Sequence, residues 1–168
     1  MQHFVTIMMG SDSDLPLVEN TINVLKGFNI KVQVRVASAH RTPDEAAAIV
    51  TEAEKNGCQV FICAAGLAAH LAGAVAARTT RPVIGIPCDG GPLNGVDALY
   101  STVQMPGGIP VATVAIGKAG AKNAGYLAAQ IMALTDPELD AAVKADRKKA
   151  SEAVVAKDKA LQDKLNAL

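Results

Sequence analysis

The stretch that decides the fold is Phe4-Val-Thr-Ile-Met-Met-Gly-Ser-Asp-Ser-Asp14, together with the segment that follows it. Residues 4–9 form a continuous, mostly apolar run that is typical of a strand buried on both faces. A polar turn comes next, and between Leu15 and Phe28 aliphatic residues recur at helical spacing. A buried strand, a turn and a helix in this order make one unit of a parallel sheet.

The same alternation of strand and helix continues along the chain. Further strands are expected at 30–36, 60–64, 82–86 and 111–116, and further helices at 43–56, 67–77, 96–103 and 119–134. Five such units predict an α/β protein, a flavodoxin-like three-layer sandwich with a five-stranded parallel sheet and helices on both faces. Because ligands bind such sheets at the carboxyl ends of the strands, the loops that follow the strands are the candidates for a site.

The second helix has a marked beginning and end. Thr42-Pro-Asp-Glu45 has the form of a capping box with proline at the first helical position. We therefore expect the Thr42 hydroxyl to accept a hydrogen bond from the first turn of this helix. Gly57 suits the end of the same helix, where a left-handed residue is common.

The sequence predicts one α/β catalytic domain over residues 1–135 and a C-terminal helical extension of that domain over 136–168. The last helix should begin near Asp136-Pro137 and run close to the end of the chain. It is rich in Lys and Ala, with a sparse apolar stripe at Leu139, Val143, Ala150, Val154, Leu161 and Leu165. We expect this helix to pack on a neighbouring subunit, and a solvated, frayed tail is the alternative.

Composition excludes several classes of partner. Sixteen basic and sixteen acidic residues cancel and aromatic residues make up 3%, so we expect neither nucleic acid nor a membrane surface as partner. The apolar stretch 61–77 is short for a membrane span, and no signal peptide precedes the first strand. Cys58, Cys63 and Cys88 lie in apolar segments without Cys-x-x-Cys spacing, which indicates buried, reduced thiols and a cytoplasmic protein.

The loop after the first strand is suited to a phosphorylated ligand. Ser11 and Ser13 offer hydroxyl groups beside the N-terminus of a helix, where phosphate binds well. The carboxylate of Asp14 would repel a phosphate dianion and is better suited to sugar hydroxyls. A purely structural role, in which Asp14 or Ser13 caps the helix, stays open.

The loop after the second strand holds three polar side chains without a structural task, Ser38, His40 and Arg41. Arg41 offers a planar fork suited to phosphate oxygens. Its charge and the nearby helix N-terminus favour a neutral imidazole at His40, which can then act as a base. His40 is therefore the candidate acid/base of an enzyme acting on a small phosphorylated substrate. A surface histidine beside a surface arginine is the alternative.

The loop after the third strand, residues 64–73, is small and apolar, so it lets backbone approach a ligand and excludes water. His70 is its one polar side chain, and on the residues alone a structural histidine is the favoured interpretation. His3, His40 and His70 lack the spacing of paired metal ligands, so no metal site is expected. The cysteines lie in apolar segments, so none is expected to be a nucleophile.

Five motifs in matching order carry a resemblance to a known family. They are Gly10-Ser-Asp-Ser-Asp14, Ser38-Ala-His-Arg-Thr-Pro43, Ala68-Ala-His-Leu71, Tyr100-Ser-Thr-Val-Gln-Met-Pro-Gly-Gly-Ile-Pro110 and Ala115-Ile-Gly-Lys-Ala-Gly-Ala-Lys-Asn123. With these motifs the chain strongly resembles the N5-carboxyaminoimidazole ribonucleotide mutases of purine biosynthesis. The resemblance covers nearly the whole chain, except the C-terminal part of the last helix.

The resemblance implies an isomerase that moves a carboxylate from the exocyclic nitrogen of an imidazole ribonucleotide to a ring carbon, without ATP, metal or organic cofactor. It implies that His40 is the acid/base and that His70 is a second catalytic residue, at the end of the site that holds the carboxylate of the substrate. It also implies homo-octamers with sites built between subunits. The residues that would bind the substrate are Ser11, Ser13, Asp14, Ser38, Arg41, Gly66 and Leu71.

The chain departs from the family pattern in places. Leu67 and Ala72 stand where many members carry Gly and Pro, and the loop 89–92 differs from the commonest pattern, so no role is assigned to it. Related enzymes that carboxylate aminoimidazole ribonucleotide directly typically carry Lys at the position of Arg41, so Arg41 favours the mutase. A direct carboxylase remains an alternative.

A non-catalytic nucleotide-binding or receiver-like module is a further alternative from another class of protein. A receiver domain needs a phospho-accepting Asp after the third strand, where this chain has Ala64-Ala65-Gly66. A flavin-binding module needs aromatic residues around the ring, and the loops that follow the strands supply only Tyr100.

Overall fold

The computed structural model describes residues 3–167, which fold into twelve elements. Five are strands, one is a short 3-10 helix (η1) and six are α-helices. In chain order they are β1 (Phe4–Met9), η1 (Asp12–Asp14), α1 (Leu15–Gly27), β2 (Lys31–Val36), α2 (Pro43–Lys55), β3 (Cys58–Ala65), α3 (Leu71–Ala76), β4 (Val83–Pro87), α4 (Val96–Val103), β5 (Ala112–Thr113), α5 (Gly117–Ala133) and α6 (Pro137–Asn166).

The five strands form one parallel sheet in the order β2-β1-β3-β4-β5. This is the strand order of flavodoxin-like folds, so the predicted fold class is confirmed. The chain runs outward from β1 to β2 and then crosses back to β3, on the other side of β1. Such a switch point leaves a crevice at the carboxyl ends of β1 and β3, where open α/β sheets bind their ligands.

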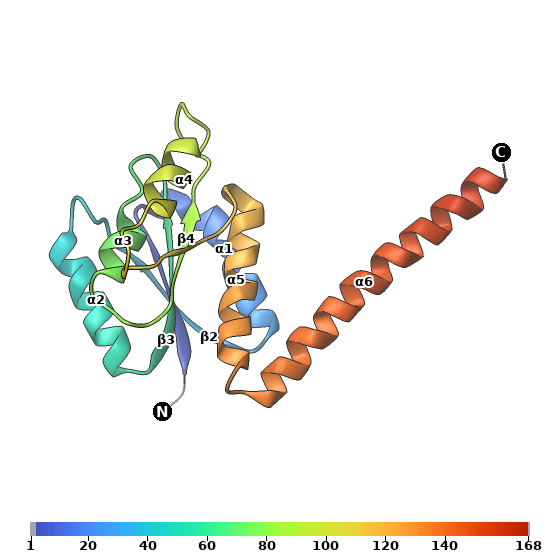
Figure 1. Cartoon of the computed structure of the whole chain (residues 1–168), viewed down its shortest axis with the longest axis horizontal. Coiled ribbons are helices and arrows are strands. Elements are labelled where there is room, and N and C mark those ends of the chain that lie inside the picture. Colours follow the sequence, from blue (N-terminus) through green and yellow to red (C-terminus); the bar gives the residue numbers. More distant parts are fainter. Residues whose placement is uncertain (1–2, 168) are drawn as a thin grey trace.

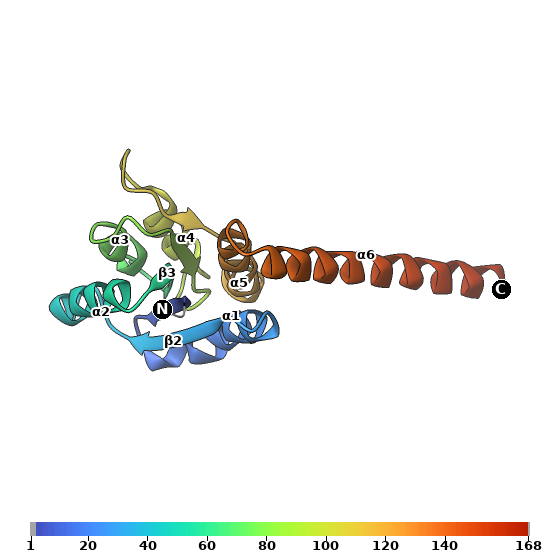
Figure 2. The ribbon, with the colours of Figure 1, turned by 90° about the horizontal axis from the view of Figure 1, so that it is seen from below.

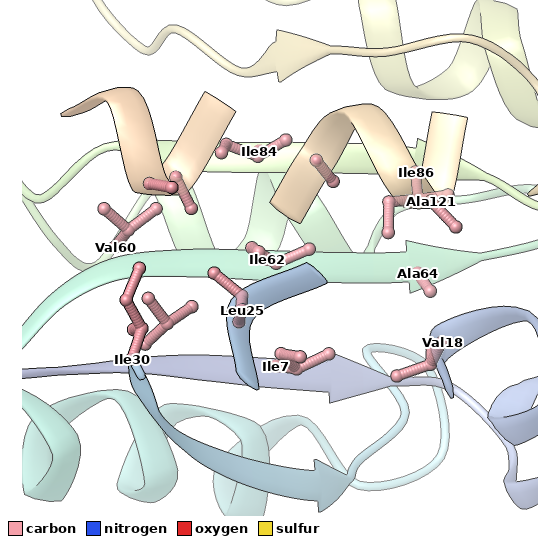
Figure 3. Close-up of a cluster of buried hydrophobic side chains, with 14 of the residues drawn as sticks. Ile7, Val18, Leu25, Ile30, Val60, Ile62, Ala64, Ile84, Ile86 and Ala121 are labelled. Atoms are coloured by element: carbon pink, nitrogen blue, oxygen red, sulfur yellow. The ribbon is translucent and has the colours of Figure 1, made fainter. Parts of the chain in front are cut away.

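Helices cover both faces of the sheet, with α1 and α5 on one side and α2 and α3 on the other (Figure 1). Alternate residues of a strand point to opposite faces, so β1 and β3, which are covered on both faces, are mostly apolar. Figure 3 shows one of the two cores, in which side chains of α1 and α5 meet the inner strands. Its members include Val18, Leu25 and Ala121 from the helices and Ile7, Ile62 and Ile84 from the strands.

The second core lies between the sheet and the helices α2 and α3, where Met8 and Phe61 pack against Ile49 and Leu71. Helix α4 covers the same face, because a Cβ added to Gly85 would meet side chains of both α3 and α4. Cys58, Cys63 and Cys88 are all buried and unbonded to one another, as the sequence predicted.

The prediction for the fifth strand is wrong in its extent. Only Ala112 and Thr113 are in strand conformation, and they pair with Ile84 and Gly85 of β4. This strand has a single neighbour, because it lies at the edge of the sheet. The chain leaves the sheet soon afterwards and enters α5 at Gly117, which has a positive φ of 71°.

Helix α6 begins as predicted, with Asp136 at its N-cap. Oδ1 of Asp136 accepts hydrogen bonds from the backbone N–H groups of Glu138 (3.1 Å) and Leu139 (3.0 Å). Leu139 is buried against the domain, whereas every described residue beyond Asp146 is exposed. Figure 2 shows that the helix extends far from the sheet. Among residues 3–167, none of the helices combines the length and the hydropathy needed to cross a membrane.

Candidate active site

One hollow of about 550 Å³ opens at the carboxyl ends of β1 and β3, at the switch point of the sheet. All nine residues that the sequence singled out line this hollow. They are Ser11, Ser13, Asp14, Ser38, His40, Arg41, Gly66, His70 and Leu71. A larger hollow of about 790 Å³ lies at the opposite end of the sheet, beside the segment that leads into β4, and contains no histidine.

The first loop presents its two serine hydroxyl groups side by side. Ser11 is the N-cap of η1, and its Oγ accepts hydrogen bonds from the backbone N–H of Ser13 (3.3 Å) and from Ser13 Oγ (2.8 Å). Asp14 stands at the N-cap of α1, but its side chain makes no capping hydrogen bond. The alternative in which the Asp14 side chain caps α1 is therefore wrong.

The carboxyl group of Asp14 is partly buried. Burial raises its pKa above the ordinary value, and hydrogen bonds from the backbone at Ser11 and from the Cys88 thiol oppose this effect. Burial also raises the pKa of the Cys88 thiol to about 12, with further contributions from the charges of Asp14 and Asp89. Cys88 is therefore a neutral donor at ordinary pH and not a nucleophile.

The second loop is closed by hydrogen bonds within Ser38–Thr42. Oγ1 of Thr42 accepts from the Ser38 backbone N–H (3.0 Å) and donates to the Ser38 carbonyl (3.2 Å). The predicted capping box is wrong, because these bonds leave Thr42 without a capping bond to α2. Pro43 does occupy the first position of α2, and Gly57, with φ of 98°, follows its end as expected.

Arg41 connects the second loop to the first. Its backbone N–H donates to Ser38 Oγ (3.1 Å), and its guanidinium Nη2 donates to the carbonyl oxygen of Gly10 (3.1 Å). The side chain is exposed, so the other guanidinium N–H groups face the solvent at the mouth of the hollow. An arginine in this place can bind phosphate oxygens beside the two serine hydroxyl groups.

His40 and His70 form a hydrogen bond that the sequence could not predict. Nε2 of His40 lies 2.6 Å from Nδ1 of His70, and the two rings are nearly perpendicular, at 88°. Two neutral nitrogens at this distance require that one donates a proton and the other accepts it. The side chain of His70 is exposed in the hollow, so His70 lies beside His40 there and is not a buried histidine of the core.

The third loop and the segment after β4 complete the apolar side of the hollow. Leu71 is almost fully buried, Gly66 is half-buried, and Leu67 is exposed with a positive φ of 56°. Cys88, Gly90 and Gly91 also line the hollow, and sequence reasoning gave them no role. The position of Cys88 directly after the fourth strand was the signal that could have found it.

No group of three or more His, Cys, Asp or Glu side chains is arranged to hold a metal ion within the part of the chain that is described. The polar groups of the hollow are instead hydroxyl groups, one guanidinium, one carboxylate, two imidazoles and the Cys88 thiol. These groups suit a sugar phosphate with a ring that must gain and lose protons.

Comparisons with known proteins identify the family of this chain. The sequence profile of the AIR carboxylase family matches residues 4–153. The N5-carboxyaminoimidazole ribonucleotide mutase of Escherichia coli is 53% identical over 135 residues, which cover 80% of each chain. The mutase of Thermotoga maritima is 48% identical, and the match covers 94% of this chain and 91% of that one. The mutase of Bacillus subtilis is 51% identical, and the match covers 83% of this chain and 86% of that one.

Solved structures extend the likeness to the whole fold. A crystal structure of Treponema denticola PurE superposes with a TM-score of 0.85 at 31% identity and covers 94% of this chain and 97% of that chain. The resemblance inferred from the five sequence motifs is thus confirmed along most of the chain. By its matched residues and by its relatives, this chain belongs to the AIR carboxylase family.

Proposed function

We propose that this chain is an isomerase of purine biosynthesis that converts N5-carboxyaminoimidazole ribonucleotide into 4-carboxy-5-aminoimidazole ribonucleotide. The relatives named above carry the name of this mutase, at about half identity over most of the chain. The observation in the structure that supports it best is the pair His40 and His70, joined at 2.6 Å in the hollow at the switch point.

In the first half of the reaction, the carbamate loses carbon dioxide. The bond between the carboxylate carbon and the exocyclic nitrogen breaks, its electron pair stays on nitrogen, and nitrogen takes a proton. His40 supplies this proton. The apolar loop 64–73 removes water from the carboxylate, which favours the loss of its charge as neutral carbon dioxide.

In the second half, the ring carbon attacks the enclosed carbon dioxide and then releases its own proton. His40, which is unprotonated after the first half, accepts this proton, so one group serves both steps. The Nδ1 atom of His40 has no hydrogen-bond partner within residues 3–167, whereas its Nε2 is joined to His70. His70 can therefore hold the ring in place and exchange a proton with it while the other nitrogen faces the substrate.

The remaining residues of the hollow bind the nucleotide. Arg41 and the paired hydroxyl groups of Ser11 and Ser13 hold the phosphate, and Asp14 accepts hydrogen bonds from the ribose hydroxyl groups. Ser38 fixes the backbone of Arg41 and completes this set. Gly66 and Leu71 lie at the carboxylate end, where a small backbone and an apolar wall are needed.

The catalytic unit comprises residues 1–135, and residues 136–168 form an extension that joins copies into a homo-octamer. Exposed apolar side chains on the free part of α6, among them Val154, Leu161 and Leu165, support an interface between copies. Three buried cysteines without a disulfide support a cytoplasmic enzyme. The reaction needs no ATP, metal or organic cofactor.

A direct carboxylase that joins carbon dioxide to aminoimidazole ribonucleotide is the second candidate. The description of the matched family, AIR carboxylase, favours it. The names of the relatives and the presence of Arg41 favour the mutase. A receiver-like module is disfavoured, because β3 ends in Ala64-Ala65 and offers no phospho-accepting carboxylate.

The decisive experiment compares two reactions of the purified protein, without ATP and with a chelator present. In the first, the carbamate ribonucleotide is the substrate, and formation of the carbon-carboxylated product is followed. In the second, aminoimidazole ribonucleotide and bicarbonate replace it. We expect the first reaction to be much the faster. Faster conversion in the second would make the chain a carboxylase, and no conversion in either would overturn both proposals.

A further inference from the structure

The hollow of about 790 Å³ at the opposite end of the sheet has the dimensions of a ligand site. One side is the turn 77–82, which connects α3 to β4, and the other side is formed by residues 108–112, which lead into β5. None of its lining residues also lines the hollow that contains His40 and His70. A molecule bound here would therefore not occupy the place of the substrate.

Two arginines of the turn, Arg78 and Arg81, line this hollow and are exposed. Both ion pairs found within residues 3–167 lie on α6, so neither guanidinium is paired with a carboxylate of the described chain. A guanidinium carries only donors, in a planar fork that fits phosphate oxygens. Two such forks in one turn suit an anion with several oxygens.

Hydrogen bonds fix the turn that carries the two arginines. The backbone N–H of Arg78 donates to the carbonyl oxygen of Val75 (2.9 Å), and the backbone N–H of Arg81 donates to Thr79 Oγ1 (3.0 Å). Oγ1 of Thr79 in turn donates to Oε1 of Glu54 (2.6 Å). The one carboxylate of the lining thus accepts a hydrogen bond from a hydroxyl group, and the two positive charges outnumber it. A turn that is already fixed loses little conformational freedom when a ligand binds.

The rest of the lining is mostly apolar. Ala76 and Val83 are buried, Ile109 is half-buried, and Pro110 lies exposed beside it. Such a wall contributes nothing to the binding of an inorganic anion, which is fully hydrated, but it contributes to the binding of a ring that leaves water. The lining therefore fits a molecule with an anionic group at one end and an apolar ring at the other.

We propose that this hollow is a second binding site, for an organic phosphate whose phosphate group binds to Arg78 and Arg81 and whose ring packs against Ile109 and Pro110. The inference goes beyond the proposed function and does not depend on it, because none of these residues belongs to the site of conversion.

Isothermal titration calorimetry at low salt tests the proposal with three probes, AMP, ribose 5-phosphate and inorganic phosphate. We expect saturable binding of AMP, with weaker binding of ribose 5-phosphate and the weakest binding of inorganic phosphate. Arg78→Gln and Arg81→Gln should each weaken the binding of AMP by about tenfold, the loss expected for one charge-assisted hydrogen bond. Conversion of the substrate should stay at the wild-type rate in both variants, which also shows that they fold.

Two control variants show where AMP binds. Arg147→Gln removes an exposed arginine of α6 that lines neither hollow, and Arg41→Gln removes the arginine of the substrate hollow. Both should bind AMP at the second site as the wild type does. Binding that is lost in Arg41→Gln and unchanged in Arg78→Gln and Arg81→Gln would place AMP in the substrate hollow and overturn the proposal.

The remaining outcomes are equally clear. Absence of saturable AMP binding to the wild-type protein would overturn the proposal, and inorganic phosphate that binds as tightly as AMP would overturn the role of the apolar wall. Failure of the wild-type protein to convert the carbamate ribonucleotide, with AMP binding dependent on Arg78 and Arg81, would overturn the proposed function and leave this inference standing.

Discussion

Nε2 of His40 lies 2.6 Å from Nδ1 of His70, although the two residues are separated by 30 positions in the chain. Because both nitrogens cannot donate at once, the pair shares one proton between the rings. His40→Asn should lower the rate of conversion by about 10³-fold, since a positioned acid/base contributes roughly that much. His70→Asn should cost less, on the order of fivefold, which corresponds to one hydrogen bond of about 1 kcal/mol.

Steady-state kinetics of both variants, with circular dichroism to confirm folding, checks this order of effects. Both side chains are exposed, so neither substitution should unfold the chain. An asparagine variant at position 40 with turnover near that of the wild type would show that the acid/base is another group.

Substitution of Arg41 should weaken the binding of the substrate. Arg41→Lys removes the fork that can bind phosphate and Gly10 together, because an ammonium group lacks its geometry. KM should rise by about tenfold with kcat little changed, since one charge-assisted hydrogen bond contributes about 1.5 kcal/mol. Arg81→Lys, the same exchange in the hollow at the opposite end of the sheet, is the matched control and should change neither constant.

Asp14 links the site to the pH dependence of stability. Because burial raises its pKa above 3.8, the carboxyl group favours folding in its protonated form. This contribution is complete below pH 3.8 and is lost as the pH rises through the pKa of the folded state. Asp14→Asn should therefore raise the urea midpoint of unfolding at neutral pH, and the gain should shrink as the pH is lowered toward 3.8.

The same substitution should raise KM, because the amide is a weaker acceptor for ribose hydroxyl groups than the carboxylate. Asp12→Asn removes one negative charge from the same turn and serves as the control. Equal gains in stability at all pH values would show that the burial of Asp14 does not oppose folding.

The helix α5 offers a test of packing. A Cβ on Gly120 would lie 1.5 Å from the backbone carbonyl oxygen of Ala115, which cannot move without disturbing the entry into α5. Gly120→Ala should lower the free energy of unfolding by about 3 kcal/mol, the upper range for overpacking in a core. Gly27→Ala, where nothing lies within 4 Å, should raise it by about 0.5 kcal/mol. Chemical denaturation of both variants measures the difference.

Much of this fold could be predicted from local patterns. The buried strands β1 and β3 must be apolar on both faces, and this shows as continuous runs such as Phe4–Met9. Edge strands give weaker signals, so the two-residue β5 was overestimated. At Thr42 the capping motif was present, but its hydroxyl is bound to Ser38, four residues earlier. A local motif cannot show to which of two nearby backbone groups a hydroxyl will form its hydrogen bonds.

The sequence could predict which polar side chains gather around the hollow, and it could not predict the contacts between them. Each polar residue followed a strand, and parallel strands end at one edge, so the collection of Ser11, Arg41 and His70 around one hollow follows from topology. The bond between the two histidines depends on loop conformations, which no spacing encodes. The contact between Leu67 and Gly91 could not be predicted either, because the side chain of Leu67 belongs to the loop after β3 and the space that it fills lies beside Gly91, in the loop after β4.

The last prediction concerns α6, whose apolar stripe continues beyond its own domain. Leu139 and Val143 pack against α5, and Tyr126 of that helix donates a hydrogen bond to Asp146 (3.0 Å). Val154 and Leu161 lie seven residues apart, on the same face of the helix, and are 65% and 51% exposed. If this face joins copies into an octamer, charges placed on it must weaken the assembly.

The double variant Val154→Asp with Leu161→Asp should therefore shift the protein to smaller species in analytical ultracentrifugation. Ala156→Asp, on the opposite face of the same helix, should leave the wild-type mass unchanged. The melting temperature of the domain should be affected only through assembly, because residues beyond Asp146 make no buried contact with it. A double variant that sediments as the wild type does would exclude this face of α6 from the interface.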